Sequence, residues 1–281
     1  MSTFHGRFAW YELITTDVEA AKAFYTSVMG WGVLNASLPG AAYTLFTAGN
    51  AFVTGLMQLP QDASKASGTP GWLGYVGVDD VDAASDRVAH LGGAVHVPPT
   101  DIPDISRFAI FTDPQAARFA AIKRLGQGRE QPAAFDAPGR VGWHELLAAD
   151  WQKALAFYGG LFGWQPADAD VGELGTYQQF SAGGETIGGM LTKPATIPAA
   201  FWLYYFNVGD LDAAAQRVEA GGGEIFAGPL EVPGGSWIVQ CTDPQGAVFA
   251  LEGRRRPKPP GYFERVASRD PSDAQGRRWS W

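Results

Sequence analysis

The feature that most limits how this chain can fold is a long internal repeat. Residues 9–31 (AWYELITTDVEAAKAFYTSVMGW) and residues 142–164 (GWHELLAADWQKALAFYGGLFGW) align without a gap at an offset of 133. Further along, GVDDVDAASDRVAHLGG recurs as NVGDLDAAAQRVEAGGG, and FTDPQAARFA recurs as CTDPQGAVFA, at an offset of 130. Colinear self-similarity over this length indicates two copies of one structural unit.

The repeat divides the chain into two domains of similar size. We expect them at residues 1–125 and 140–253, joined by a Gly/Pro-rich linker at residues 126–139. Residues 254–281 are a basic, Pro-rich tail with eight Lys/Arg and three Asp/Glu, within a chain whose net charge is −8. The body is therefore acidic, which argues against nucleic acid as its partner. We expect the tail to be solvated or to lie against its own protein.

Four aspartates mark the starts of predicted helices in both copies. Each ends an extended segment and precedes a helical pattern, because an aspartate carboxylate caps the free amides of a first helical turn. They are Asp17, Asp80, Asp150 and Asp210. Glycines follow each helical pattern, and short β-like runs come after them. The sequence thus predicts a β-α-β-β-β unit that is used four times.

These motifs resemble the vicinal oxygen chelate superfamily. The paired units, the Phe-Tyr near the end of the first helix, the Gly-Trp after it and the Asp-Pro turn before the last strand carry the resemblance, over residues 7–124 and 140–253. The superfamily includes glyoxalase I, extradiol dioxygenases and resistance proteins of the bleomycin and fosfomycin types. The tandem W-x-E-L start resembles a branch of hydroxylases and culture-filtrate antigens. The resemblance implies an α+β fold of two tandem domains, each with two βαβββ modules forming a cupped, mostly antiparallel sheet of about eight strands.

The metal-ligand positions that the resemblance implies hold no metal ligands here. In the superfamily they lie about seven residues before each capping aspartate and seven after the aspartate of the Asp-Pro turn. In this chain they are Trp10, Trp143, Leu73, Leu203, Ala120 and Ala250. Such side chains cannot bind a divalent cation. We therefore expect neither a metal nor another cofactor, and a displaced site using His144 or Glu252 stays open as an alternative.

A glutamate recurs in the apolar first strand of both copies, as Glu12 and Glu145. Strand side chains alternate between faces, so each glutamate shares the cup with the tryptophan two residues before it. We take the two glutamates as candidate catalytic residues. The candidate ligand-binding residues around them are Trp10, Trp143, Tyr75, Tyr205, Met57, Met190, Leu73 and Leu203.

Two interpretations of the repeated glutamate stay open. It is either an acid that moves a proton at neutral pH because apolar walls raise its pKa, or a scaffold residue paired with a donor. By strand alternation Arg118 faces the same side of the sheet as Glu12 and can donate to it. Its counterpart Val248 has no hydrogen-bond donor for Glu145. The second domain is thus the expected functional one. His144 has the opposite parity to Glu145, so we expect it on the helix side of the sheet.

Together these features predict cups that bind or chemically handle a small, partly aromatic organic molecule without a metal, which leaves a metal-independent enzyme, lyase or hydroxylase-like, open. The alternatives are a non-catalytic, ligand-sequestering protein and a metal-dependent lyase or dioxygenase. No apolar run reaches the roughly 18 residues of a membrane helix, and no signal peptide is visible, so we expect a cytoplasmic protein with no membrane partner. Cys241 is the one cysteine, and we expect it to be a buried, inert thiol. A homo-oligomer is compatible with the sequence.

Overall fold

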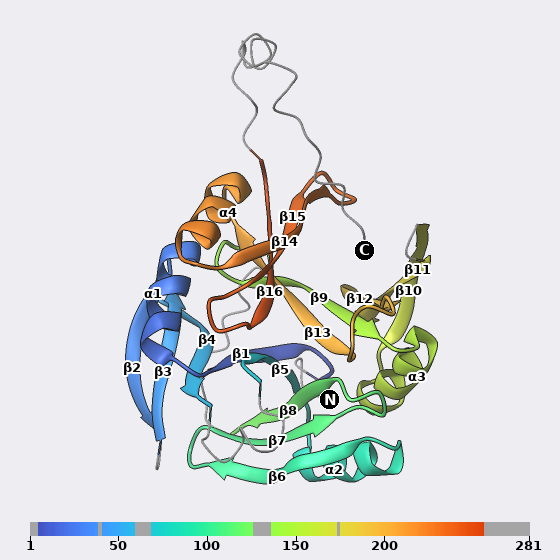
Figure 1. Cartoon of the computed structure of the whole chain (residues 1–281). Coiled ribbons are helices and arrows are strands. Elements are labelled where there is room, and N and C mark those ends of the chain that lie inside the picture. The colour runs from blue at the N-terminus through green and yellow to red at the C-terminus, as the bar shows by residue number, and fades with distance from the viewer. Residues whose placement is uncertain (1–4, 39–40, 60–68, 126–135, 173–174, 256–281) are drawn as a thin grey trace, which may run out of the picture.

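The computed structural model describes residues 5–38, 41–59, 69–125, 136–172 and 175–255. Most of the linker, at residues 126–135, and the tail from residue 256 onward lie outside these ranges. Both repeats form the same succession of elements, which Figure 1 shows coloured along the chain.

The first repeat forms β1 (Phe8–Thr15), α1 (Val18–Met29), β2 (Gly32–Leu38), β3 (Ala41–Ala48), β4 (Ala51–Gln58), β5 (Gly71–Gly77), α2 (Val81–His90), β6 (Ala94–Ile102), β7 (Ser106–Thr112) and β8 (Arg118–Arg124). The second repeat forms β9 (Val141–Ala148), α3 (Trp151–Phe162), β10 (Gln165–Gly172), β11 (Gly175–Ala182), β12 (Glu185–Thr192), β13 (Phe201–Val208), α4 (Leu211–Ala220), β14 (Glu224–Glu231), β15 (Trp237–Thr242) and β16 (Val248–Gly253).

Each repeat builds one eight-stranded sheet. The strand orders are β2-β3-β4-β1-β5-β8-β7-β6 and β10-β11-β12-β9-β13-β16-β15-β14. In each sheet two neighbouring pairs are parallel, β1/β4 and β5/β8 in the first and β9/β12 and β13/β16 in the second. The remaining pairs are antiparallel. The α+β fold of tandem βαβββ units, with mostly antiparallel sheets, is thereby confirmed.

The four helices begin at the aspartates that the sequence pattern singled out. Each aspartate has extended backbone angles, and its carboxylate accepts a hydrogen bond from the backbone N–H three residues later, as Asp17 does from Ala20 at 3.0 Å. Helices α1 and α3 end at Gly30 and Gly163, whose φ angles of 71° and 76° are left-handed. A residue with a Cβ adopts that conformation at a cost, so glycine is favoured there.

The main core is shared by the two repeats. One buried cluster contains apolar side chains from all four helices and from the helix-facing side of both sheets. Two smaller clusters lie on the opposite sheet faces and contain no helix residues. We call these opposite faces the first and second helix-free faces. The sequence predicted two domains, and their principal core forms only where the repeats meet.

Reciprocal hydrogen bonds join the repeats through the Phe-Tyr and Asp-Pro motifs. The Tyr25 hydroxyl of α1 donates to Asp243 Oδ2 in the second repeat at 3.1 Å, and the Tyr158 hydroxyl of α3 donates to Asp113 Oδ2 in the first repeat, also at 3.1 Å. Helix α1 accordingly packs beside α4, as Figure 1 shows. Motifs that recur within each copy therefore act between the copies.

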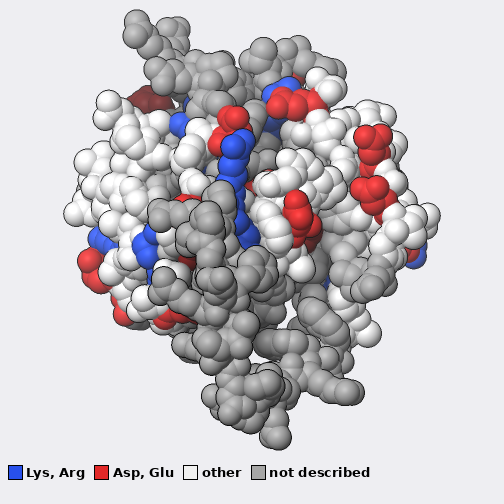
Figure 2. All heavy atoms as spheres, turned by 90° about the horizontal axis from the view of Figure 1, so that it is seen from above, with Lys and Arg blue, Asp and Glu red and all other residues white. Residues whose placement is uncertain are grey.

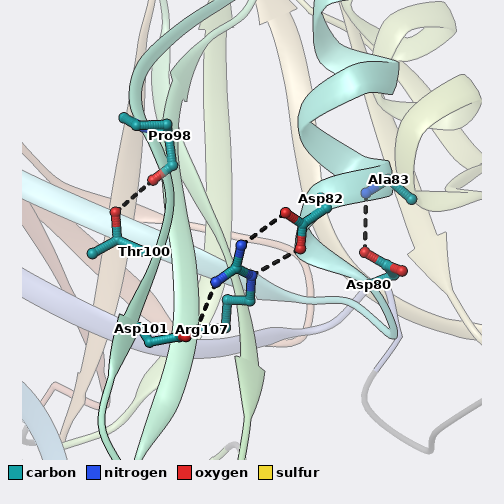
Figure 3. A network of polar contacts seen from close by, with 7 residues as sticks. All are labelled: Asp80, Asp82, Ala83, Pro98, Thr100, Asp101 and Arg107. Carbon is teal, nitrogen blue, oxygen red and sulfur yellow. Dashed lines mark hydrogen bonds and ion pairs between the residues drawn. The ribbon is translucent and has the colours of Figure 1, made fainter.

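A charged cluster ties α2 to the edge of the first sheet (Figure 3). Arg107 on β7 donates two hydrogen bonds to the carboxylate of Asp82 on α2 and one to Asp101 on β6, each at 2.8 Å. In the second repeat Trp237 occupies the position of Arg107. There Arg255 binds Asp212 at 2.8 Å and lies 4.9 Å from the centre of the Trp237 ring. Each repeat thus binds its second helix through an arginine. Arg107 of β7 binds α2 in the first repeat, and Arg255, just after β16, binds α4 in the second.

The outer surface gives no strong sign of a charged docking site in the view of Figure 2. On that face the described Lys and Arg side chains lie in small groups close to Asp and Glu, among largely uncharged surface. Exposed ion pairs of this kind contribute little to stability. Among the described residues, no helix is both long enough and apolar enough to span a membrane.

Candidate functional site

The first helix-free face carries a carboxyl group held by two phenols. Glu12 on β1 accepts a hydrogen bond from the Tyr75 hydroxyl at 2.8 Å, and Tyr43 on β3 also hydrogen-bonds to it. The Trp10 indole N–H donates to the Tyr43 hydroxyl at 3.2 Å. We call Trp10, Glu12, Tyr43 and Tyr75 the first Glu–Tyr cluster.

The second helix-free face repeats this arrangement and adds one member. The Tyr205 hydroxyl donates to Glu145 Oε1 at 3.1 Å, and Tyr177 also hydrogen-bonds to Glu145. The Trp143 indole N–H donates to the Tyr177 hydroxyl at 2.7 Å. Gln240 on β15 donates from Nε2 to the Tyr205 hydroxyl at 2.8 Å. Trp143, Glu145, Tyr177, Tyr205 and Gln240 form the second Glu–Tyr cluster.

A glycine in the intervening strand lets one phenol of each cluster reach its glutamate. Glu12 is paired with Gly55 on β4, and Glu145 is paired with Gly189 on β12. A Cβ on Gly55 would lie 1.9 Å from the Tyr43 hydroxyl oxygen, and one on Gly189 would lie 2.3 Å from Cζ of Tyr177. Any larger residue would occupy the space that the tyrosine crosses. These glycines are therefore part of the site.

The expected partner of Glu12 is wrong. Sequence parity assigned that role to Arg118, but the donors to Glu12 are the hydroxyls of Tyr75 and Tyr43, while Arg118 is exposed. Neutral donors do not compensate a buried charge as an arginine would, and burial raises the pKa of Glu12 above its usual range.

The apolar candidates divide between two environments. Leu73 and Met57 belong to the apolar cluster of the first helix-free face, and Leu203 belongs to that of the second. Met190 does not lie on this face: it is fully buried in the central core. Met190 pairs with Leu146 on the core side, so the structural offset in this strand is 134 rather than 133. The expectation that Met190 lines the cup was wrong for this reason.

His144 lies between the repeats, on the side of the sheet away from Glu145. Its Nε2 is 2.5 Å from the Tyr11 hydroxyl, and its Nδ1 is 2.5 Å from the Ile187 carbonyl oxygen. Its ring stacks on Phe8 with 4.0 Å between centroids. Burial lowers the pKa of His144 to about 4. It is therefore a neutral interface residue, as its parity predicted, and it does not reach the helix-free face.

The two glutamates differ in burial. Glu12 is only 7% exposed, whereas Glu145 is intermediate. Desolvation raises the pKa of Glu145 to about 7, against the lowering effect of the bonds from Tyr205 and Tyr177. A carboxyl whose pKa lies near neutral pH can take up or release a proton without a large energetic cost, which is the property of a general acid–base residue.

The described residues do not fit the metal that this kind of fold commonly carries. Among them, no group of three or more His, Cys, Asp or Glu side chains is placed to hold a metal ion. Glu252 shares the second helix-free face, but its carboxylate accepts a hydrogen bond from the Ser236 hydroxyl at 2.6 Å. Phenols and amides around one carboxyl are not the usual ligands of zinc or iron.

Three residues of these clusters escaped the sequence analysis: Tyr43, Tyr177 and Gln240. The two tyrosines recur at an offset of 134, three residues before Phe46 and Phe180, and the ring of each lies against a glycine on the next strand. That recurrence was a usable signal. Gln240 has no such signal, because its counterpart in the first repeat is Ile110.

Comparison with known proteins gives one family and several relatives. The family model described as "Glyoxalase/Bleomycin resistance protein/Dioxygenase superfamily" matches residues 7–120 and 140–251. A Mycobacterium bovis protein named "Putative glyoxylase CFP32" is 35% identical, over 86% of this chain and 92% of its own. "Anthracycline biosynthesis protein DauV" of a Streptomyces species is 32% identical, over 89% of this chain and 94% of its own.

Solved structures resemble the fold across nearly the whole chain. The Mn(II)-bound glyoxalase from Novosphingobium aromaticivorans has a TM-score of 0.63 at 18% identity, covering 90% of this chain and 83% of its own. The 2,3-dioxygenase LapB from Pseudomonas has a TM-score of 0.61 at 12% identity, covering 92% and 96%. Identities this low show a shared fold and nothing about the reaction.

Proposed function

The chain belongs to the glyoxalase/bleomycin resistance protein/dioxygenase superfamily, and from that premise we propose that its second helix-free face binds a small, partly aromatic organic molecule. We further propose that Glu145 exchanges a proton with this molecule without a metal. The observation that carries the proposal is the Glu145 carboxyl, which two tyrosine hydroxyls bind and whose pKa burial raises to about 7.

The residues around Glu145 suit an aromatic ligand. Trp143, Tyr177 and Phe201 contribute rings to the apolar cluster of this face. Aromatic walls with a few polar groups are typical of small-molecule sites. Two relatives are named anthracycline biosynthesis proteins, which supports a polycyclic aromatic ligand for this chain as well.

The chemistry we propose is proton transfer. Ionised Glu145 takes a proton from the bound molecule, and the protonated form returns it to another atom of the same molecule. The two steps balance without an oxidant or reductant, so an isomerisation is the simplest reaction class. Tyr205 donates to the ionised form and keeps the carboxyl oriented while the proton is absent.

The paired glutamates provide the test. Isothermal titration calorimetry with an anthracycline as the probe should show binding to the parent protein. Glu145→Gln should weaken this binding or abolish turnover and leave the melting temperature nearly unchanged. Glu12→Gln should mainly lower the melting temperature, because Glu12 is buried and bound by Tyr75 and Tyr43. Equal behaviour of the two variants would refute the proposal.

The non-catalytic alternative is a sequestering protein that uses the same face. Incubation of the probe with the parent protein, followed by chromatography of the released ligand, separates the two functions. Recovery of unchanged probe with tight binding that is insensitive to Glu145→Gln would favour sequestration over proton transfer.

A further inference from the structure

We propose that Gln240 is a positioning residue that directs the hydroxyl proton of Tyr205 at Glu145. This inference rests on the proposed function of the second Glu–Tyr cluster. It assigns to Gln240 a role in preparing Glu145 rather than contact with the ligand.

The hydrogen bonds form a chain with one direction. Gln240 Nε2 donates to the Tyr205 hydroxyl at 2.8 Å, and that hydroxyl donates to Glu145 Oε1 at 3.1 Å. A tyrosine hydroxyl has a single proton, and an amide N–H bound at its oxygen leaves that proton free for the carboxylate. Accepting one hydrogen bond also strengthens the bond that the same hydroxyl donates. Gln240 therefore favours the ionised form of Glu145.

The first repeat lacks this support at the same place in the sheet. Gln240 pairs with Ala250 across β15 and β16, and Ile110 pairs with Ala120 across β7 and β8. Ile110 has no polar atom, so the Tyr75 hydroxyl that binds Glu12 receives no amide donor from this position. The chain thus contains both versions of the cluster. The second has the hydrogen-bond chain from Gln240 through Tyr205 to Glu145, which we call the relay, and the first lacks it.

The titratable groups that hydrogen-bond to Glu145 are Tyr177 on β11 and Tyr205 on β13. Glu252 on β16 acts electrostatically on Tyr177, and the uncharged Gln240 on β15 donates to Tyr205. Replacing Gln240 leaves the other three in place. A change in the titration of Glu145 can therefore be assigned to the loss of the relay.

The test is the titration of Glu145, followed by the 13C NMR signal of its side-chain carboxyl group and assigned with Glu145→Gln. Gln240→Met keeps the length of the side chain and removes the amide. We expect this variant to raise the titration midpoint by about 0.5–1 pH unit, since one supporting hydrogen bond is lost. Ile110→Met is the matched control for packing at the equivalent site of the first repeat. It should leave the titration midpoint of Glu12 unchanged.

The reciprocal variant makes the inference falsifiable even if Gln240→Met is unstable. Ile110→Gln adds an amide beside Tyr75 and should lower the titration midpoint of Glu12. A purely structural role for Gln240 would change the melting temperature and leave both midpoints where they are, which would overturn the inference. These titrations need no ligand, so the proposed function can fail in the calorimetric test while the relay stands, and the reverse also holds.

Discussion

Replacing Gly189 by alanine tests the claim that a glycine opens the path of Tyr177 to Glu145. The new Cβ would lie 2.3 Å from Cζ of Tyr177 and 2.4 Å from its hydroxyl oxygen. Ordinary contact begins at 3.4 Å, so the ring has to move by about 1 Å or leave the site. The variant then loses the hydrogen bond to Glu145. Overpacking and this loss together should lower the free energy of unfolding by about 2–4 kcal/mol.

A double-mutant cycle isolates the steric cause. In a Tyr177→Ala background the ring is absent, so Gly189→Ala should cost less than about 1 kcal/mol. Urea denaturation of the four proteins measures the coupling. Gly71→Ala is the matched control, because a Cβ on this strand glycine meets no atom within 4 Å. Additive effects of the two substitutions, or a cost of Gly189→Ala no larger than that of Gly71→Ala, would refute the reasoning.

Three further predictions concern stability. Ala116 has a left-handed φ of 72° where the second repeat has Gly246, so Ala116→Gly should raise the free energy of unfolding by up to about 1 kcal/mol, and a lower melting temperature would contradict this. The pKa of Glu145 is raised from 4.5 to about 7 in the folded protein, so the free energy of unfolding should fall as pH rises between these values. Glu145→Gln should make urea midpoints less dependent on pH in that window. An unaltered pH dependence would count against this prediction. Tyr158→Phe removes the bond to Asp113 between the repeats and should cost about 1–2 kcal/mol in urea denaturation; a cost near zero would mean that the bond adds nothing to the interface.

The sequence predicted those features that depend on local chemistry. Helix starts follow from the ability of an aspartate to cap a first turn, and all four aspartates do so. Strand parity placed Glu12 and Glu145 on one side and His144 on the other, because alternation is a property of any strand. Repetition of these local signals predicted the βαβββ unit, and the resemblance to the superfamily implied how these units form a cupped sheet.

The remainder of the site depends on contacts between strands that no single segment encodes. Tyr177 reaches Glu145 only because Gly189 lies between them on a third strand. Parity put Arg118 on the correct face but could not show that the hydroxyls of Tyr75 and Tyr43 bind Glu12 instead. Alignment of the repeats misplaced Met190 by one residue, and a shift of one residue moves a strand side chain to the other face.

The reciprocal bonds of Tyr25 with Asp243 and of Tyr158 with Asp113 make the contact between the repeats self-complementary. A single copy of the repeat would leave the helix-facing side of its sheet open to water, because the main core contains side chains of both repeats. Two chains of half this length could make the same contacts as a symmetric homodimer. In one continuous chain the two halves need not share one sequence, and they differ in this way at Gln240 and its counterpart Ile110.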